Sequence, residues 1–246
     1  MKSSTRLTKR RIVTESERLL PAIVFPLSDW IPGRRRVPSQ ARSLRTRDQI
    51  LKAAEMLAKS EGAGNVSMQM IASKAKVAAG TAYQFFDDRD AIFSEIYEDW
   101  VTTWWPALMN ATSRPWTEDN WQDELHRVVA SMGKTYLESS SRWEIITYIH
   151  STRHGRDAAQ TLLQANISRY VDWAGPLFRG RGYSVTETRA ICSLLVRTIR
   201  GHWIYGVHTL AEMRELVKTA ETGMSAIVNV MLARSNRPRS VSLRRS

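Results

Sequence analysis

The stretch VSMQMIASKAKVAAGTAYQFFDDRDAI, residues 66–92, contains the pattern that decides how this chain folds. It predicts two short helices, over 67–74 and 78–86, separated by a tight turn, with Ser67 as a good N-cap for the first. The Asp87-Asp88 pair predicts the start of a third helix, because carboxylates suit the positive N-terminal end of a helix. A short helix, a tight turn and a second helix with small residues at its start are typical of a helix-turn-helix, which enters the major groove of DNA.

The second predicted helix has one face for the core and another for DNA. Ala82 and Phe86 lie four residues apart, so they face inward together. Gln84 is the best candidate for reading a base edge, because glutamine can form two hydrogen bonds with adenine, while Thr81 and the alanine methyl groups can contact a thymine methyl. The residues that can reach outward are Ala79, Gly80, Thr81, Tyr83 and Gln84.

Over about residues 43–93 the chain resembles the DNA-binding half of the TetR family of transcriptional regulators. The resemblance is dense from Ile71 to Phe86. It implies that the helix over 78–86 reads the major groove, and that the positions of Tyr83 and Arg89 bind phosphate. The matching residues are Ile50, Ala53, Ala54, Gly62, Ile71, Ala72, Ala75, Val77, Gly80, Thr81, Tyr83, Phe86 and Ile92.

Three positions depart from the family pattern. Lys76 stands in the turn where the family usually has glycine, and a lysine in the left-handed region costs about 1 kcal/mol. Ala78 stands where a serine often caps the second helix, and loss of such a cap costs about 1 kcal/mol. Ala79 often aligns with a polar or basic residue. These departures leave few polar side chains for reading base edges.

A helix is expected to precede the motif, over residues 45–62. Its apolar residues recur at three- and four-residue steps and form one face, and Gly62 suits its C-terminal end. Arg45 and Arg47 near its start are candidates for phosphate contacts, with solvated surface arginines as the alternative. The complete predicted DNA-contact set is Arg45, Arg47, Ser67, Ala79, Gly80, Thr81, Tyr83, Gln84 and Arg89.

The positive charge of the chain lies at its two ends. Residues 1–42 hold ten lysines and arginines against three acidic residues, and residues 234–246 hold five arginines and no acid, so together they carry the whole net charge of +12. Non-specific attraction to DNA would therefore come largely from these ends. We interpret 1–42 as a basic, flexible extension and 234–246 as a basic tail, either DNA-contacting arms or solvated segments without a dedicated role.

The remainder of the chain predicts an all-α protein. After a helix that starts near Asp88 and is kinked or ended by Pro106, helices are expected over 117–139, 142–153, 157–174, 185–207 and 210–233. Three capping boxes support their starts, at Ser141-x-x-Glu144, Ser184-x-x-Glu187 and Thr209-x-x-Glu212. We therefore predict a three-helix DNA-binding domain at 43–93, with its motif at about 67–86, followed by a larger helical effector-binding and dimerisation domain at 94–233.

The last two predicted helices are long and amphipathic, and the resemblance implies that they pair with their copies in a homodimer. The alternative is that these faces fill only their own core. The residues on these faces are Ile191, Leu194, Leu195, Thr198 and Trp203 on one helix, and Leu216, Ala220, Met224, Ile227 and Met231 on the other.

The chain holds nine tryptophans, and aromatic side chains line many small-molecule pockets. They also fill cores, which is the alternative at each position. The resemblance implies a pocket enclosed by the middle helices, for which the candidates are Trp105, Trp143, Tyr148 and Trp173. The neutral body of the chain favours an apolar or aromatic effector over a multiply charged one.

Other classes of function have little support in the sequence. His150 and His154 could share a metal, but no third ligand follows from their spacing, so no metal and no cofactor are expected. No catalytic fingerprint occurs, so we do not predict an enzyme. No apolar run is long enough to cross a membrane, and the single cysteine, Cys192, fits a reducing compartment.

The sequence therefore predicts a cytoplasmic, homodimeric, DNA-binding transcriptional regulator. We expect a repressor that binds a palindromic double-stranded operator and is released by a small effector. A constitutive DNA-binding protein without an effector is the alternative. The base sequence of the operator and the identity of the effector do not follow from the residues.

Overall fold

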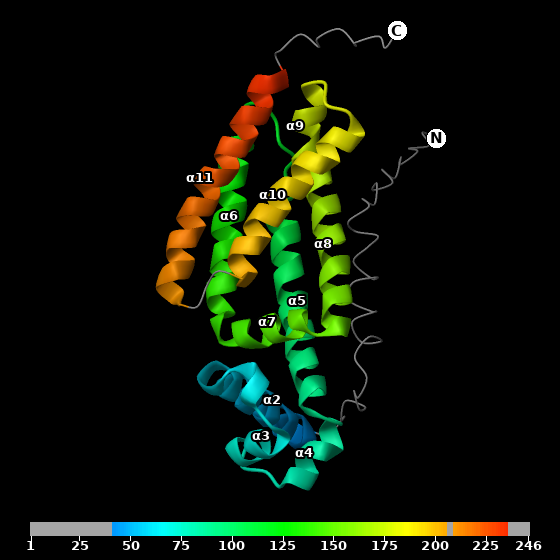
Figure 1. The fold of residues 1–246 in the computed structure, drawn as a ribbon, viewed down its shortest axis with the longest axis vertical. Coiled ribbons are helices and arrows are strands. Elements are labelled where there is room, and N and C mark those ends of the chain that lie inside the picture. Colours follow the sequence, from blue (N-terminus) through cyan, green and yellow to red (C-terminus); the bar gives the residue numbers. More distant parts are fainter. Residues whose placement is uncertain (1–40, 206–208, 236–246) are drawn as a thin grey trace, which may run out of the picture.

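The computed structural model describes residues 41–205 and 209–235, and every element in these ranges is a helix. Figure 1 shows a small head, formed by α2, α3 and α4, below a larger body of long helices. Helix α5 begins in the head and continues upward through the body, so one helix joins the two parts. The predicted basic ends lie almost entirely outside the described residues, so their roles stay predictions.

The head is built from α2 (Ala41–Glu61), the short 3-10 helix η1 (Ala63–Asn65), α3 (Met68–Lys74) and α4 (Ala79–Phe85). The side chain of Ser67 caps α3 by accepting a hydrogen bond from the backbone nitrogen of Met70, at 3.3 Å. Lys76 adopts a positive φ of 57°, and Ala78 provides no side-chain cap for α4. The predicted cap at Ser67 is confirmed, and so are two unfavourable departures from the family pattern, the left-handed Lys76 and the missing side-chain cap at Ala78.

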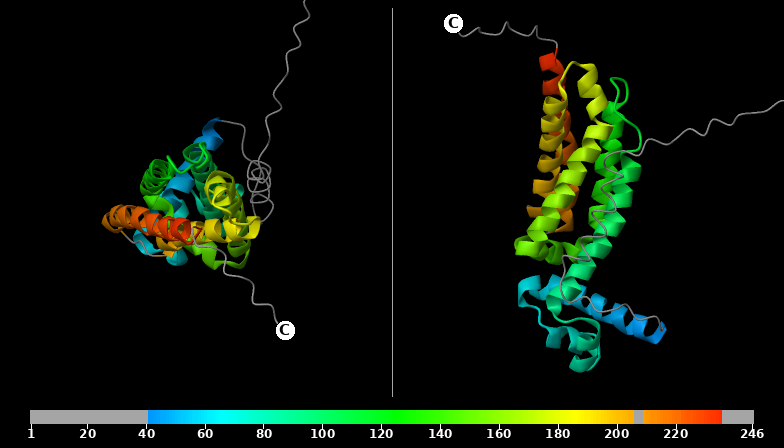
Figure 2. Two further views of the ribbon diagram at one scale, coloured as in Figure 1. Left: turned by 90° about the horizontal axis from the view of Figure 1, so that it is seen from above. Right: turned by 90° about the vertical axis from the view of Figure 1, so that its right-hand side faces the viewer.

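The body contains α5 (Arg89–Ala111), α6 (Trp121–Glu138), α7 (Trp143–Ser151), α8 (Arg153–Trp173), α9 (Gly175–Gly180), α10 (Val185–Tyr205) and α11 (Leu210–Ser235), with η2 (Ser140–Arg142) before α7. The views in Figure 2 show the same helices from above and from the side. Asp88 caps α5 by accepting from the backbone nitrogen of Ala91 at 2.8 Å. The capping boxes at Ser184 and Thr209 both form, because Glu187 and Glu212 accept from the backbone nitrogens of their capping residues.

Several predicted boundaries were wrong. Pro106 does not end α5, which continues to Ala111. Helix α6 begins at Trp121 rather than near 117, because the Asn120 side chain holds a turn with the backbone of Thr117. The capping box predicted at Ser141 does not form: its hydroxyl hydrogen-bonds Glu55, and Arg142 stands at the N-cap of α7. Helix α9 was not predicted.

Gly155 was predicted to break a helix, but it lies inside the first turn of α8. A methyl group at this position would come within 1.8 Å of the backbone oxygen of Ile149. The glycine therefore lets α8 pass close to the end of α7, and Thr152 caps α8 by accepting from the Gly155 nitrogen at 3.1 Å. Close packing, rather than a turn, explains why glycine fits here.

The packing of the last two helices bears on the predicted dimer. Helix α11 packs on α6, and Met224 is fully buried within the chain, while Leu194 on α10 and Val230 on α11 are exposed apolar side chains. Part of the predicted interface set therefore fills the core of a single chain. The side chain of Trp203 lies outside the described residues. Homodimer formation stays a prediction.

Candidate DNA-binding surface and effector cavity

Helix α4 presents an exposed surface at the end of the molecule distant from α9 (Figure 1). Ala79, Gly80, Tyr83 and Gln84 are exposed, and Thr81 is half-buried. Ala82 and Phe86 are buried against the rest of the head, as their spacing predicted. A methyl group added at Gly80 would meet no atom within 4 Å, so the surface around the start of α4 is open.

Arg45 is exposed, but Arg47 is engaged inside the protein. The guanidinium of Arg47 donates to the carboxylate of Glu95 in an ion pair, and it lies over the ring of Phe86 at 5.4 Å from the ring centroid. Its side chain is only 11% exposed. Arg47 is thus held by α5 instead of facing solvent, which differs from the prediction of a phosphate contact.

Arg89 is also engaged within the protein. Its Nη1 donates to the backbone oxygens of Gly64 at 3.1 Å and Val66 at 2.9 Å, just before α3. Its Nη2 donates to the hydroxyl of Tyr148 on α7, whose ring centroid lies 4.9 Å from the guanidinium. The side chain that resemblance assigned to phosphate therefore ties the head to the body in this structure.

Tyr148 completes this connection instead of lining a cavity. Its hydroxyl donates to the carboxylate of Asp90 at 3.0 Å while it accepts from Arg89. Burial, and then the neighbouring Asp90 carboxylate, raise the pKa of Tyr148, so its hydroxyl stays protonated as a donor. We name Arg89, Asp90 and Tyr148 the junction triad.

A second set of contacts joins the head to the body beside the junction triad. Arg142, at the start of α7, pairs with Glu55 of α2 at 2.8 Å and with Asp99 of α5 at 2.7 Å. The short helix α7 is thus held to α2 and to α5 by charged side chains near its first residue.

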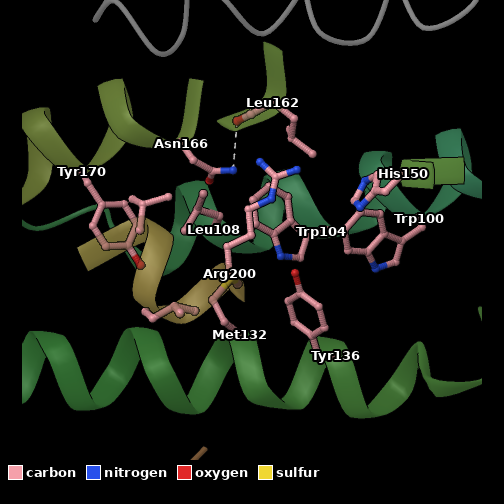
Figure 3. A pocket seen from close by; sticks show the side chains of 12 residues that line it. Trp100, Trp104, Leu108, Met132, Tyr136, His150, Leu162, Asn166, Tyr170 and Arg200 are labelled. Carbon is pink, nitrogen blue, oxygen red and sulfur yellow. Dashed lines mark hydrogen bonds between the residues drawn. The ribbon is translucent and has the colours of Figure 1, made fainter. Parts of the chain in front are cut away.

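A small cavity of about 30 Å³ lies inside the body (Figure 3). It is enclosed by side chains of α5, α6, α7, α8 and α10, and its wall is mostly apolar and aromatic. The residues that line it are Trp100, Trp104, Leu108, Met132, Tyr136, His150, Leu162, Asn166, Tyr170, Val196, Ile199 and Arg200.

The four residues predicted for an effector pocket do not line this cavity. Trp105 and Trp173 are buried elsewhere in the core, Trp143 is half-buried at the start of α7, and Tyr148 belongs to the junction triad. Trp100 and Trp104 line it instead. The four-residue spacing of this pair places both on one face of α5, which was the sequence signal that the prediction did not use.

His150 and Arg200, which both line the cavity, differ in charge near pH 7. His150 lies 2.9 Å from the hydroxyl of Tyr97 through its Nε2. Burial, and secondarily the charge of Arg200, lower the pKa of His150 to about 3, so the imidazole is neutral near pH 7. The Arg200 guanidinium donates to the backbone oxygen of Ala159 at 2.8 Å and supplies positive charge at the cavity wall.

Two negative findings apply to the described residues. Within residues 41–205 and 209–235, no group of three or more His, Cys, Asp or Glu side chains is placed to hold a metal. None of the described helices is both long enough and apolar enough to span a membrane. The side chain of His154, the second histidine of the weak metal hypothesis, lies outside the described residues.

The head shows the class of protein. Helix α4 packs against α3 and keeps its outer face exposed, which is the arrangement of a helix-turn-helix in a DNA-binding regulator. Residues 50–96 match the sequence model of the bacterial regulatory proteins of the tetR family. The helix-turn-helix region of this chain is therefore of the TetR family type.

Solved structures share its fold. PfmR, a TetR family regulator from Thermus thermophilus, is 14% identical with a TM-score of 0.56, over 78% of this chain and 96% of that one. SmeT in complex with triclosan is 18% identical with a TM-score of 0.55, over 76% and 91%. NalD, the secondary repressor of the MexAB-OprM multidrug efflux pump in Pseudomonas aeruginosa, is 20% identical with a TM-score of 0.51, over 79% and 97%. No curated protein sequence matches the chain.

Proposed function

We propose that this regulator is a cytoplasmic homodimeric repressor that leaves a palindromic operator when a small, mainly apolar or aromatic effector binds in its body. The observation that carries the DNA-binding part is the open outer face of α4, within a head that matches the family. The outer face carries the hydrogen-bonding side chains of exposed Tyr83 and Gln84 and of half-buried Thr81, and no carboxylate. Gln84 would read a base edge, and Tyr83 would contact phosphate.

A dimer supplies the second recognition helix. Exposed Leu194 and Val230 on α10 and α11 support a contact between copies through these helices. Two-fold symmetry would then place two α4 helices in successive major grooves, about 34 Å apart. A site read in this way has two half-sites that mirror each other.

The link from cavity to DNA would pass through α7. His150 of this helix lines the cavity, and Tyr148, two residues earlier, belongs to the junction triad. An effector that enlarges the cavity pushes on His150 and so on α7, and the junction triad passes this displacement to the segment before α3. The effector acts only if it binds the displaced arrangement more tightly than the DNA-binding one.

Two structural neighbours support a repressor released by a small molecule. SmeT was solved with triclosan, and NalD is a repressor. The small size of the cavity favours the alternative, a DNA-binding protein without an effector, because a drug-sized ligand needs about 300 Å³ or more. Under our proposal the cavity must expand when the effector enters.

The test of DNA recognition is selection from a random duplex library with the full-length chain, followed by affinity measurements on the enriched site. We expect a palindromic sequence to emerge. Replacing Tyr83 and Gln84 together by alanine should weaken binding to it about 100-fold, since a good base contact is worth roughly 1–3 kcal/mol. The melting temperature should stay unchanged, because both side chains are exposed.

The control is the double variant Met56→Ala, Ser60→Ala, which alters an exposed surface of α2 in the same head. It should bind the selected site like the wild type. A library with no enriched sequence, or full affinity in the α4 variant, would rule out α4 as the reading surface.

A further inference from the structure

A groove of about 410 Å³ lies next to the cavity, between α8 and α10. It is lined by His150, Arg156, Ala159, Gln160, Leu163, Arg197 and Arg200. His150 and Arg200 belong to both linings, so these two side chains form the wall between the apolar interior and the groove. A ligand that displaced the Arg200 side chain would join the two spaces.

The groove and cavity together contain positive charge and no negative charge. Arg156, Arg197 and Arg200 contribute three guanidinium groups, and neither lining includes an aspartate or a glutamate. In the part of the chain that the structure describes, no carboxylate forms an ion pair with any of these three arginines. A guanidinium binds a carboxylate through two parallel hydrogen bonds, whereas a neutral ligand would only remove it from water.

The cavity wall also contains hydrogen-bond donors without acceptors. The indole nitrogens of Trp100 and Trp104 are buried and have no partner among the described residues, and the same holds for Nδ1 of His150. If Nε2 of the neutral His150 accepts from Tyr97, its Nδ1 carries the proton and is a third donor. Buried donors without acceptors are unfavourable, so a ligand oxygen held between Arg200 and His150 would satisfy the donor on His150.

We propose that the effector is an amphipathic carboxylate, with its apolar or aromatic body among Trp100 and Trp104 and its carboxylate on Arg200. This inference rests on the proposed effector site and specifies its ligand class. Figure 3 shows the Arg200 guanidinium on the side of the cavity where Leu162 and Asn166 lie. Arg200 exchanges its hydrogen bond to Ala159 for the carboxylate, and its side chain swings aside to admit the body of the ligand.

The experiment is calorimetric titration of the full-length protein with three acids, phenylbutyrate, naphthylacetate and decanoate, and with the alcohols that match them. At least one acid should bind about tenfold or more tightly than its alcohol, because only the acid forms a charge-assisted hydrogen bond. The Arg200→Gln variant should lose this preference, whereas Arg200→Lys should keep part of it.

The matched control is Arg189→Gln, which removes an arginine from the same helix. Arg189 contacts Gln164 of α8 at 3.2 Å but lines neither space. This variant should keep the full preference for the acid. Circular dichroism and melting temperature show that each variant is folded.

Three results would overturn the proposal: alcohols that bind as tightly as their acids, a preference that survives Arg200→Gln, or no binding of any acid at millimolar concentration. Operator binding is measured separately on the selected DNA. A chain that recognises DNA but prefers the alcohols loses the ligand class and keeps the regulator proposal. A chain that binds acids through Arg200 but selects no DNA keeps the site and loses the regulator proposal.

Discussion

The outer surface of α4 and the junction between the head and the body differ in how closely other parts of the chain pack against them. The α4 surface is open, and a methyl group at Gly80 would touch nothing. The junction between head and body contains several contacts between residues far apart in the chain, such as Arg89 with Tyr148 and Arg142 with Glu55. The comparison teaches that the α4 surface leaves its side chains free of internal contacts, whereas the junction is held from both sides by hydrogen bonds and ion pairs.

The largest expected effect comes from the same substitution at a crowded glycine inside the body and at the open glycine of α4. Gly155→Ala should destabilise the chain by about 3 kcal/mol, because its methyl group would overlap the backbone of Ile149. Gly80→Ala should instead stabilise the head by about 0.5–1 kcal/mol, since alanine favours the helix. Urea unfolding measures both.

The same pair also tests the role of the α4 surface. If DNA approaches the backbone at Gly80, Gly80→Ala should bind the selected operator more weakly despite its greater stability. Equal destabilisation by the two substitutions would contradict the contrast between an open and a crowded region.

The next effect concerns the interior side of α7. The pKa of His150 is lowered to about 3 in the folded chain, so the unfolded chain takes up a proton on this imidazole at a higher pH. Stability is therefore fully present above about pH 6.5 and should fall as the pH drops toward 3, by about 1.4 kcal/mol at roughly pH 5.5. Unfolding at several pH values should show this loss in the wild type and not in His150→Gln.

His126→Gln is the control for this measurement, because His126 is an exposed histidine beside Glu221. It should retain the acid-dependent loss of the wild type. An unchanged pH dependence in His150→Gln would show that His150 does not cause the loss.

A smaller effect isolates the junction triad. Tyr148→Phe removes the hydroxyl that links α7 to Arg89 and Asp90 of α5, at a cost of about 1 kcal/mol. We expect the change in operator affinity caused by an effector to shrink. Tyr183→Phe removes a similar hydrogen bond, to the backbone of Met231, away from the head. It should cost similar stability and leave the effector's influence intact, as titrations of operator binding with and without effector would show.

The smallest effect tests strain in the head. Lys76→Gly should stabilise the chain by about 0.5 kcal/mol, since glycine adopts a positive φ without penalty while gaining freedom in the unfolded state. Lys74→Gly, at the end of α3, should destabilise it by up to about 1 kcal/mol. The melting temperatures of both variants measure these changes. A lower melting temperature in Lys76→Gly would contradict backbone strain at Lys76.

The sequence predicted the head well and the interior of the body poorly. The caps at Ser67 and Asp88 follow from neighbours within a few residues, and the left-handed Lys76 follows from the glycine that the resembled family usually has there. The structure confirms each. Arg47 shows the limit, because its partner Glu95 lies on another helix, 48 residues away. Nothing in the residues around Arg47 indicates that α5 would hold it away from DNA.

The local sequence by itself determined most of the helices, the caps at Ser67, Asp88, Ser184 and Thr209, and the helix-turn-helix, because these depend on spacing and on hydrogen bonds between near neighbours. Only the tertiary structure decided which tryptophans face a cavity and which arginines remain near solvent. Five helices meet around the cavity, and the direction of each side chain depends on how those helices pack. The periodicity of a single helix cannot assign its partners, so Trp100, Trp104 and Arg200 became candidates only once the fold was known.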